Sequence, residues 1–203
     1  MNNRQPNISV EELLNLVAMQ QIAKDKLSPE ILKAIKRGFD TGAFNAKVSS
    51  LRFQLSDPKV QNVLNKVAEK TNGIAGTTIE ELSRKVNDVL LKGGSSLDIE
   101  KVIKQYFTHI KSTRVPTIAQ TMTTSGFEGG QQVAFDTAGI DKKKWLTQRD
   151  GSVRHSHIEA DGQLAVVGGG FQVGSSVLEY PGDPNGQAKE VINCRCSMLP
   201  VIT

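Results

Sequence analysis

The first half of the chain has the hydrophobic spacing of amphipathic helices. Between residues 10 and 110, apolar residues recur at intervals of three and four, which places them on one face of a helix. Two such groups are Leu13, Leu14, Val17 and Ala18, and Val60, Val63, Leu64 and Val67. The pattern predicts a mainly α-helical region over residues 1–112.

Capping and turn residues divide this region into separate helices. The Ser-Pro and Asp-Pro pairs at 28–29 and 57–58 predict helix starts with proline in the first turn. The sequence Thr-Thr-Ile-Glu-Glu at 77–81 has the spacing of a capping box, and Gly93-Gly94 predicts the end of the helix that follows. Another helix is expected from residues 95–96. Because the connection is so short, these last two helices should form an antiparallel hairpin.

The segment from Arg114 to Gly139 has a helical pattern that contains several glycines. Gly126, Gly129 and Gly130 lie among its apolar residues. Glycine inside a helix is unfavourable, so these positions predict an interruption of the helix. Its two explanations are a bend and the close packing of a second helix.

Beyond Gly139 the pattern changes to short segments bounded by turn residues. The expected elements are strands at 144–147, on both sides of Gly168–Gly170 within 163–173, and at 190–202, with a short helix at 150–162. Residues 181–186, Pro-Gly-Asp-Pro-Asn-Gly, can only form a loop. The predicted fold class is therefore α+β, with a small mixed α/β C-terminal domain over residues 113–203 after the helical region 1–112.

The composition is that of a globular protein. Its 203 residues, 38% hydrophobic and 23% charged, suffice for one or two domains without disulfides. The sequence contains no run of about 20 apolar residues and no apolar signal-peptide core, so we expect no membrane segment and synthesis in the cytosol. Aromatic residues, at 5%, are too sparse for a base-stacking nucleic-acid platform.

Positive charge is concentrated in the N-terminal part. Residues 1–112 contain 17 Lys and Arg against 12 Asp and Glu, whereas residues 113–203 contain 8 against 9. An excess of this size is usual for a solvated helical surface. The alternative is a face that contacts phosphates or an acidic partner.

The densest polar cluster is the sequence Arg-His-Ser-His-Ile-Glu-Ala-Asp-Gly at 154–162. On a helix, Arg154, His157 and Asp161 would share one face. Such a face is either a structural polar network or a site in which a carboxylate orients the imidazole. Arg195 is expected to join the network by pairing with one of three acids: Glu159, Asp161 or Glu190. We predict the structural network of Arg154, His157, Asp161 and Arg195, and no catalytic residue.

Two cysteines lie near the end of the sequence. Cys194 and Cys196 alternate along the expected strand, so both should lie on its buried side, reduced and poorly spaced for a mutual disulfide. Their simplest role is that of small core residues. The alternative is a zinc site formed by His157, Cys194 and Cys196, because thiolate and imidazole suit that ion. No other cofactor is expected, since Gly168–Gly170 lacks the lysine of a P-loop and the spacing of a dinucleotide fingerprint.

Several short motifs occur in a characteristic order. They are Thr117–Thr121 in a predicted helix, Lys144-Trp145, Arg-x-x-His-x-x-x-Asp-Gly at 154–162, Tyr180–Pro184, and Ile-Asn-Cys-Arg-Cys at 192–196. In this combination, residues 75–203 resemble the phage head morphogenesis family, the Mu F-like minor head proteins of tailed bacteriophages.

The resemblance implies a minor capsid protein that acts in head assembly at or near the portal and influences DNA packaging or exit. Its expected partners are the portal protein, a scaffold or major capsid protein, and DNA bound without sequence specificity. Its expected location is the virion, in the head interior or at the portal vertex, and the host cytoplasm during assembly.

Two other functions remain open at this point. One is a DNA-associated internal protein that is ejected from the virion. The other is an enzyme, because the family's C-terminal domain is similar in element order to the ADP-ribosyltransferase fold. In that alternative, Arg154 or His157 would contact a nucleotide and Glu190 would be the catalytic acid.

Overall fold

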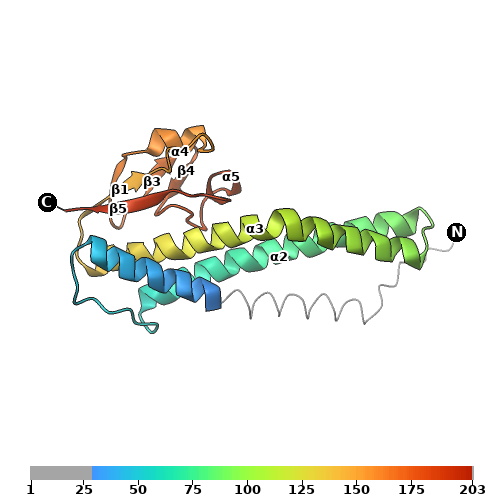
Figure 1. The fold of residues 1–203 in the computed structure, drawn as a ribbon, viewed down its shortest axis with the longest axis horizontal. Helices are drawn as coiled ribbons and strands as arrows, with labels where there is room; N and C mark the ends of the chain where they lie inside the picture. Colours follow the sequence, from blue (N-terminus) through green and yellow to red (C-terminus); the bar gives the residue numbers. More distant parts are fainter. Residues whose placement is uncertain (1–28, 203) are drawn as a thin grey trace. The chain divides into compact units, whose positions relative to one another are not determined.

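The computed structural model describes residues 29–202 and confirms the α+β class. Long helices come first and short strands follow (Figure 1). Residues 29–45 are helical. The later elements are α2 (Pro58–Leu91), α3 (Ser96–Thr137), β1 (Lys142–Leu146), α4 (His155–Ala160), β2 (Leu164–Val166), β3 (Phe171–Val173), β4 (Ser176–Leu178), α5 (Ala188–Val191) and β5 (Ser197–Val201). The helix expected around Leu13 to Ala18 lies outside the described residues.

Helix α2 begins at the predicted Asp-Pro pair. The Asp57 carboxylate accepts a hydrogen bond from the Lys59 N–H at 2.8 Å, as expected of a capping residue before a first-turn proline. The predicted end at Gly93-Gly94 is also correct, because Gly93 has a φ of 74°. The predicted start at 77–81 is wrong. The chain is already helical from Pro58, so the capping-box sequence there is part of a continuous helix.

Helix α3 begins with a reciprocal cap. The Ser95 hydroxyl accepts the Asp98 N–H at 3.3 Å, and the Asp98 carboxylate accepts the Ser95 N–H at 2.8 Å. The helix then continues through Pro116 and the three glycines to Thr137, so the predicted interruption is wrong. Of its two explanations, close packing of a second helix is the correct one.

The contacts divide the described residues into two compact units. One unit consists of residues 70–116 and the other of residues 29–69 together with 117–202. The first unit is the predicted helical hairpin. In it the Tyr106 hydroxyl donates to the Thr78 carbonyl at 3.0 Å, and the Arg114 guanidinium lies 2.9 Å from the Glu81 carboxylate.

In the second unit, glycines bring the helix at residues 29–45 close to α3. A Cβ atom on Gly130 would lie 2.1 Å from the Ile35 carbonyl oxygen, and one on Gly38 would lie 1.8 Å from the Phe127 carbonyl oxygen. Gly126 and Gly42 line the same contact. Each helix therefore contributes two glycines four residues apart, and at Gly38 and Gly130 only a hydrogen atom allows the backbones to approach so closely.

Two small antiparallel sheets form the rest of the second unit. The first has the strand order β2-β1-β5, in which Lys144 pairs with Leu164 on one side and Leu199 on the other. The second consists of β3 and β4. The strand predicted over 190–202 is only partly correct. Residues 188–191 form α5, residues 192–196 form a loop, and the strand begins at Ser197, so strand alternation does not place the two cysteines.

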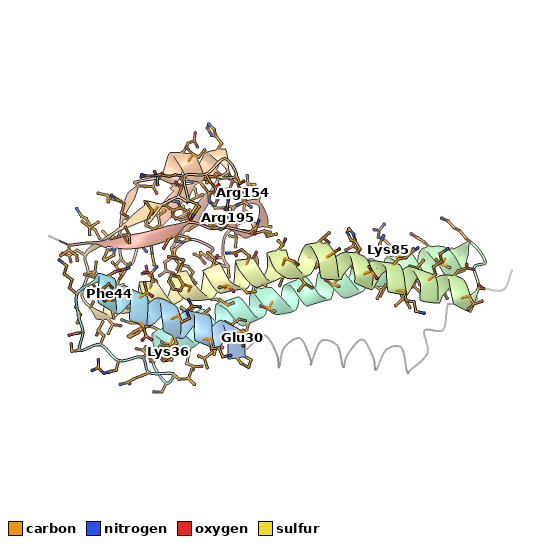
Figure 2. All side chains as sticks on the ribbon, in the orientation of Figure 1. Glu30, Lys36, Phe44, Lys85, Arg154 and Arg195 are labelled. Carbon is orange, nitrogen blue, oxygen red and sulfur yellow. The ribbon has the colours of Figure 1, made fainter. Side chains whose placement is uncertain are left out.

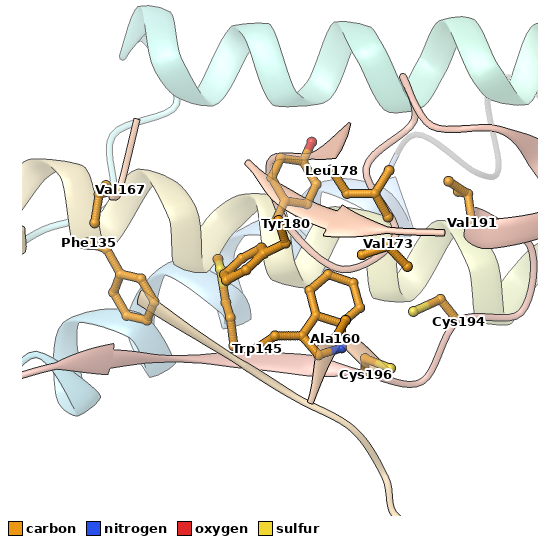
Figure 3. Close-up of a cluster of buried hydrophobic side chains, with 12 residues drawn as sticks. Phe135, Trp145, Ala160, Val167, Val173, Leu178, Tyr180, Val191, Cys194 and Cys196 are labelled. Atoms are coloured by element: carbon orange, nitrogen blue, oxygen red, sulfur yellow. The ribbon is translucent and has the colours of Figure 1, made fainter. Parts of the chain in front are cut away.

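A single apolar cluster fills the space around these sheets (Figure 3). Its fully buried members include Phe135 of α3, Trp145 of β1, and Phe171 of β3. Trp145 and Phe171 pack edge to face, with ring centroids 5.3 Å apart. Cys194 and Cys196 lie at one side of this cluster. No helix described in residues 29–202 is both long and apolar enough to cross a membrane.

Helix α3 presents a stripe of buried polar side chains to the strands and loops. We call Thr121, Thr124, Ser125, Glu128 and Gln132 the polar stripe. Each bonds a backbone group of the C-terminal segment: the N–H groups of Asn193 and Met198 donate to Thr121 and Glu128, and the carbonyls of Cys194, Gly182 and Val167 accept from Thr124, Ser125 and Gln132. The polar stripe thus holds loop residues that have no sheet partners, and also Met198 near the start of β5.

Replacing Gly130 with alanine should destabilise the second unit. The added methyl would collide with the Ile35 carbonyl, and overpacking of this kind costs about 1–3 kcal/mol. Thermal and urea unfolding of Gly130→Ala would measure the loss. Gly73→Ala is the control, because a Cβ there meets nothing within 4 Å and alanine favours a helix interior. Equal stability of the Gly130→Ala protein and the parent would contradict the observed contact.

The buried Glu128 should make stability depend on pH. Burial raises its pKa from 4.5 to about 8, and hydrogen bonds from Ser197, Met198 and Gln131 only partly offset this effect. The folded protein therefore holds a proton that the unfolded chain loses above pH 4.5. Stability should fall as pH rises from 4.5 towards 8, by about 1.4 kcal/mol per pH unit for one such group. Urea unfolding of the parent and Glu128→Gln across this range should show a flatter profile for the variant; parallel profiles would refute the assignment.

Candidate functional site

His157, Cys194 and Cys196 meet in the second unit. His157 lies in the short helix α4, which follows a turn in which the Asp150 carboxylate accepts the Ser152 N–H at 2.9 Å. The cysteines lie in the loop at residues 192–196, between α5 and β5. The polar stripe holds this loop on both sides of Cys194, through the Asn193 N–H and the Cys194 carbonyl. Sequence-distant elements therefore bring the three side chains together.

The three side chains are buried and in mutual contact. The exposed fractions of His157, Cys194 and Cys196 are 2%, 1% and 5%. The Nδ1 atom of His157 lies 3.3 Å from the Cys196 sulfur and 3.8 Å from the Cys194 sulfur. The three donor atoms all lie within 4.8 Å of one another. Two thiols and an imidazole are the donor types that zinc prefers.

The other ring nitrogen of His157 faces a carboxylate. Its Nε2 atom lies 3.4 Å from an oxygen of the buried Glu190, a contact that falls outside hydrogen-bond geometry. The Ser156 hydroxyl donates to the same oxygen at 2.7 Å. On another side of the site, the Trp145 ring packs edge to face against the imidazole, with centroids 5.7 Å apart. His157 is thus enclosed between thiols, a carboxylate and an aromatic ring.

The two thiols have opposite acidities. A hydrogen bond from Cys196 lowers the pKa of Cys194 to about 5, with a further contribution from His157. The bond to Cys194 and burial together raise the pKa of Cys196. The pair therefore shares one proton, and a thiolate beside the imidazole is favoured at neutral pH.

Arg154, Asp161 and Arg195 do not form the predicted network with His157. Arg154 donates to the Ile192 carbonyl, and Arg195 pairs with Asp150 through two hydrogen bonds of 2.6 and 2.9 Å. Asp161 instead accepts the Thr147 N–H at 2.9 Å and the Arg149 side chain at 3.0 Å. The predicted partners of Arg195 were therefore wrong. Helix α4 is only six residues long, so the expected common face does not extend to residues 154 and 161.

A small cavity borders the site. Its volume is about 20 Å³, and its lining residues are Gln148, Ser152, Val153, Arg154, His157, Asn193, Arg195 and Cys196. Both Arg154 and Arg195, which are labelled in Figure 2, line this cavity. A cavity of this size holds about one water molecule.

Sequence reasoning identified the three clustered residues and overlooked others around them. No role was predicted for Ser156, although it directly precedes His157. Trp145 could have been placed in the core, because Trp145 and Lys143 are two residues apart in β1 and therefore share its buried face. Glu190 was considered only as a catalytic acid or as a partner of Arg195. No sequence pattern connects α5 with α4, so the contact between Glu190 and His157 was not predictable.

Two curated proteins are similar to this chain. The first is the uncharacterized protein YqbB of Bacillus subtilis (strain 168), 30% identical over 126 residues, which are 58% of this chain and 41% of that protein. The second is the NAD(+)--arginine ADP-ribosyltransferase EFV of Enterococcus faecalis (strain ATCC 700802 / V583), 26% identical over 156 residues, which are 77% of this chain and 28% of that protein. The chain therefore spans less than half of each relative. No family model and no solved structure matches it.

Removal of the Asp161 carboxylate should weaken the link between β1 and α4. The Thr147 N–H lowers the pKa of Asp161, and this N–H would lose its acceptor in Asp161→Ala. A hydrogen bond to a charged group is worth about 1.5–3 kcal/mol, so we expect a loss of that order in urea unfolding. Glu159→Ala is the control, since Glu159 is exposed and its carboxylate lies 3.3 Å from the exposed His155 of the same helix. Similar losses in both variants would contradict this role.

Proposed function

We propose that this chain is a minor head protein of a tailed bacteriophage, which acts in head assembly at or near the portal. The observation that carries the proposal is what the motif residues contact. These are the residues through which the chain resembles the Mu F-like family. Arg154, Asp161 and Arg195 hold backbone segments or neighbouring charges together. These residues serve the fold of a small domain, which supports a structural role.

The loop Tyr180–Pro184 supports the same reading. The Asp183 carboxylate accepts the backbone N–H groups of Glu179 at 2.9 Å and Asn185 at 3.0 Å. The Gly182 carbonyl accepts from Ser125 of the polar stripe at 2.7 Å. Gly182 has a φ of 77°, which favours glycine at this position. The motif thus encodes a tightly bonded loop.

ADP-ribosyl transfer is a second candidate, favoured by the likeness to the Enterococcus enzyme. The placement of Glu190 weighs against the role that the sequence suggested for it. Glu190 is 4% exposed, and its carboxylate accepts a hydrogen bond from Ser156 and lies 3.4 Å from His157 Nε2. The cavity beside His157, at about 20 Å³, is also far too small for a dinucleotide. The structural assignment is therefore the better supported of the two.

Co-expression with the portal protein of the same genome tests the proposal. We expect the two proteins to co-elute in size-exclusion chromatography at micromolar concentration, while the portal protein of an unrelated phage elutes separately. Elution of the two cognate proteins as separate peaks would contradict portal docking.

Two further assays distinguish the alternatives. NAD cleavage by the purified chain, abolished in Glu190→Ala, would establish the transferase instead. DNA affinity that falls steeply with salt, without portal binding, would favour the internal DNA-associated protein. A head protein docked at the portal needs neither property.

A further inference from the structure

The cluster of His157, Cys194 and Cys196 has the dimensions of a metal site. In a tetrahedral zinc site, Zn–S bonds of about 2.3 Å and Zn–N bonds of about 2.05 Å place nitrogen and sulfur about 3.6 Å apart. The observed separations between His157 Nδ1 and the two sulfur atoms are 3.3 and 3.8 Å. Both nitrogen–sulfur separations are therefore within about 0.3 Å of the zinc-site value, and the two sulfur atoms lie within 4.8 Å of each other.

We propose that His157 Nδ1, Cys194 Sγ and Cys196 Sγ bind one Zn²⁺ ion. Binding displaces the remaining thiol protons to solvent, because the thiolate is the form that coordinates the metal. Three coordinate bonds to the ion then replace the thiol–imidazole contacts, which are only weak hydrogen bonds. This inference is independent of the function proposed above, because it concerns the ligands alone.

The surroundings of His157 fit a metal-bound imidazole. Coordination through Nδ1 leaves the proton on Nε2, which is buried, unpartnered and 3.4 Å from the Glu190 carboxylate. Histidine ligands commonly direct this N–H to a carboxylate, which orients the ring and increases its basicity. Ser156 holds the Glu190 oxygen in place at 2.7 Å.

The Trp145 indole also fits a metal site. Its N–H is buried and has no conventional acceptor. It lies beside Cys196 (Figure 3). A sulfur that carries the negative charge of a coordinated thiolate is a better acceptor for this N–H than a neutral thiol. Metal binding therefore provides a hydrogen-bond acceptor for a second buried donor, the Trp145 N–H, which otherwise has none.

The small cavity beside the site offers room for a fourth ligand. It touches both His157 and Cys196, and its volume of about 20 Å³ admits one water molecule. Gln148 and Asn193 are among its lining residues. The complete site is therefore Cys₂His with one water, and it links α4 to the loop at 192–196.

Elemental analysis of the full chain, purified without chelators, tests the site. We expect about one zinc ion per chain, and its removal by a chelator should lower the melting temperature until zinc is restored. Replacement by Co²⁺ should produce thiolate-to-cobalt absorption. Zinc-free protein that gains neither stability with added zinc nor this absorption with cobalt would overturn the proposal in favour of two free core thiols.

Variants locate the bound ion. Cys194→Ser, Cys196→Ser and His157→Asn should each abolish stoichiometric zinc, whereas His155→Asn, at a position with an 86% exposed side chain, should retain it. Glu190→Gln should still bind zinc, with about 10–100-fold lower affinity in competition with a chelator. Undiminished zinc in a soluble Cys194→Ser/Cys196→Ser double variant would place the metal elsewhere and refute the assignment.

Discussion

The second unit depends on the buried polar stripe of α3. The strands in this unit are only three to five residues long, so the sheets can satisfy few of the backbone groups in the segments between them. Thr121, Thr124, Ser125, Glu128 and Gln132 supply the missing donors and acceptors to segments near residues 167, 182 and 192–198. Each of these side chains is hydrogen-bonded to a backbone group, so its burial does not leave either group unpaired. Lys143 extends the same arrangement, since its buried ammonium donates to Gln132 and to the carbonyls of Val167 and Glu179.

The opposite face of α3 meets a different requirement. Gly126 and Gly130 lie about half a turn away from the polar stripe, and there they admit the helix at residues 29–45 to backbone contact. One face of α3 thus forms hydrogen bonds to loops. The opposite face has glycines, which carry no side chain, and packs against another helix. The candidate metal site depends on the first of them, because the polar stripe fixes the backbone on both sides of Cys194.

The motif residues separate into two groups by what they contact. Arg154, Asp161, Asp183 and Arg195 bind backbone groups or surface charges, and these contacts stabilise loops. His157, Cys194 and Cys196 contact one another in a buried cluster that offers donor atoms for a metal. Neither group forms a cleft for a nucleotide, although the chain is similar to part of an ADP-ribosyltransferase. A common fold can persist in proteins that differ in chemistry, which is why the function is argued from these contacts.

Local sequence patterns were sufficient for the elements whose signals lie within a few residues. The start of α2 at Pro58, its end before Gly93, the hairpin and the short strands β1, β2 and β3 all follow from caps, turns and periodicity. The same patterns failed where a remote contact decides the outcome. The capping-box sequence at 77–81 lies inside a helix, the glycines of α3 mark helix packing instead of a break, and the cysteines lie in a loop because α3 holds it. The sequence alone also paired His157 with the cysteines as an alternative, but only the tertiary structure brought Glu190, Ser156 and Trp145 around it. Propensity and capping act over one or two helical turns, whereas the contacts of His157 with Trp145 and Cys196 join residues 12 and 39 positions apart, and that of Thr124 with Cys194 joins residues 70 positions apart. These contacts are decided by the packing of the whole unit.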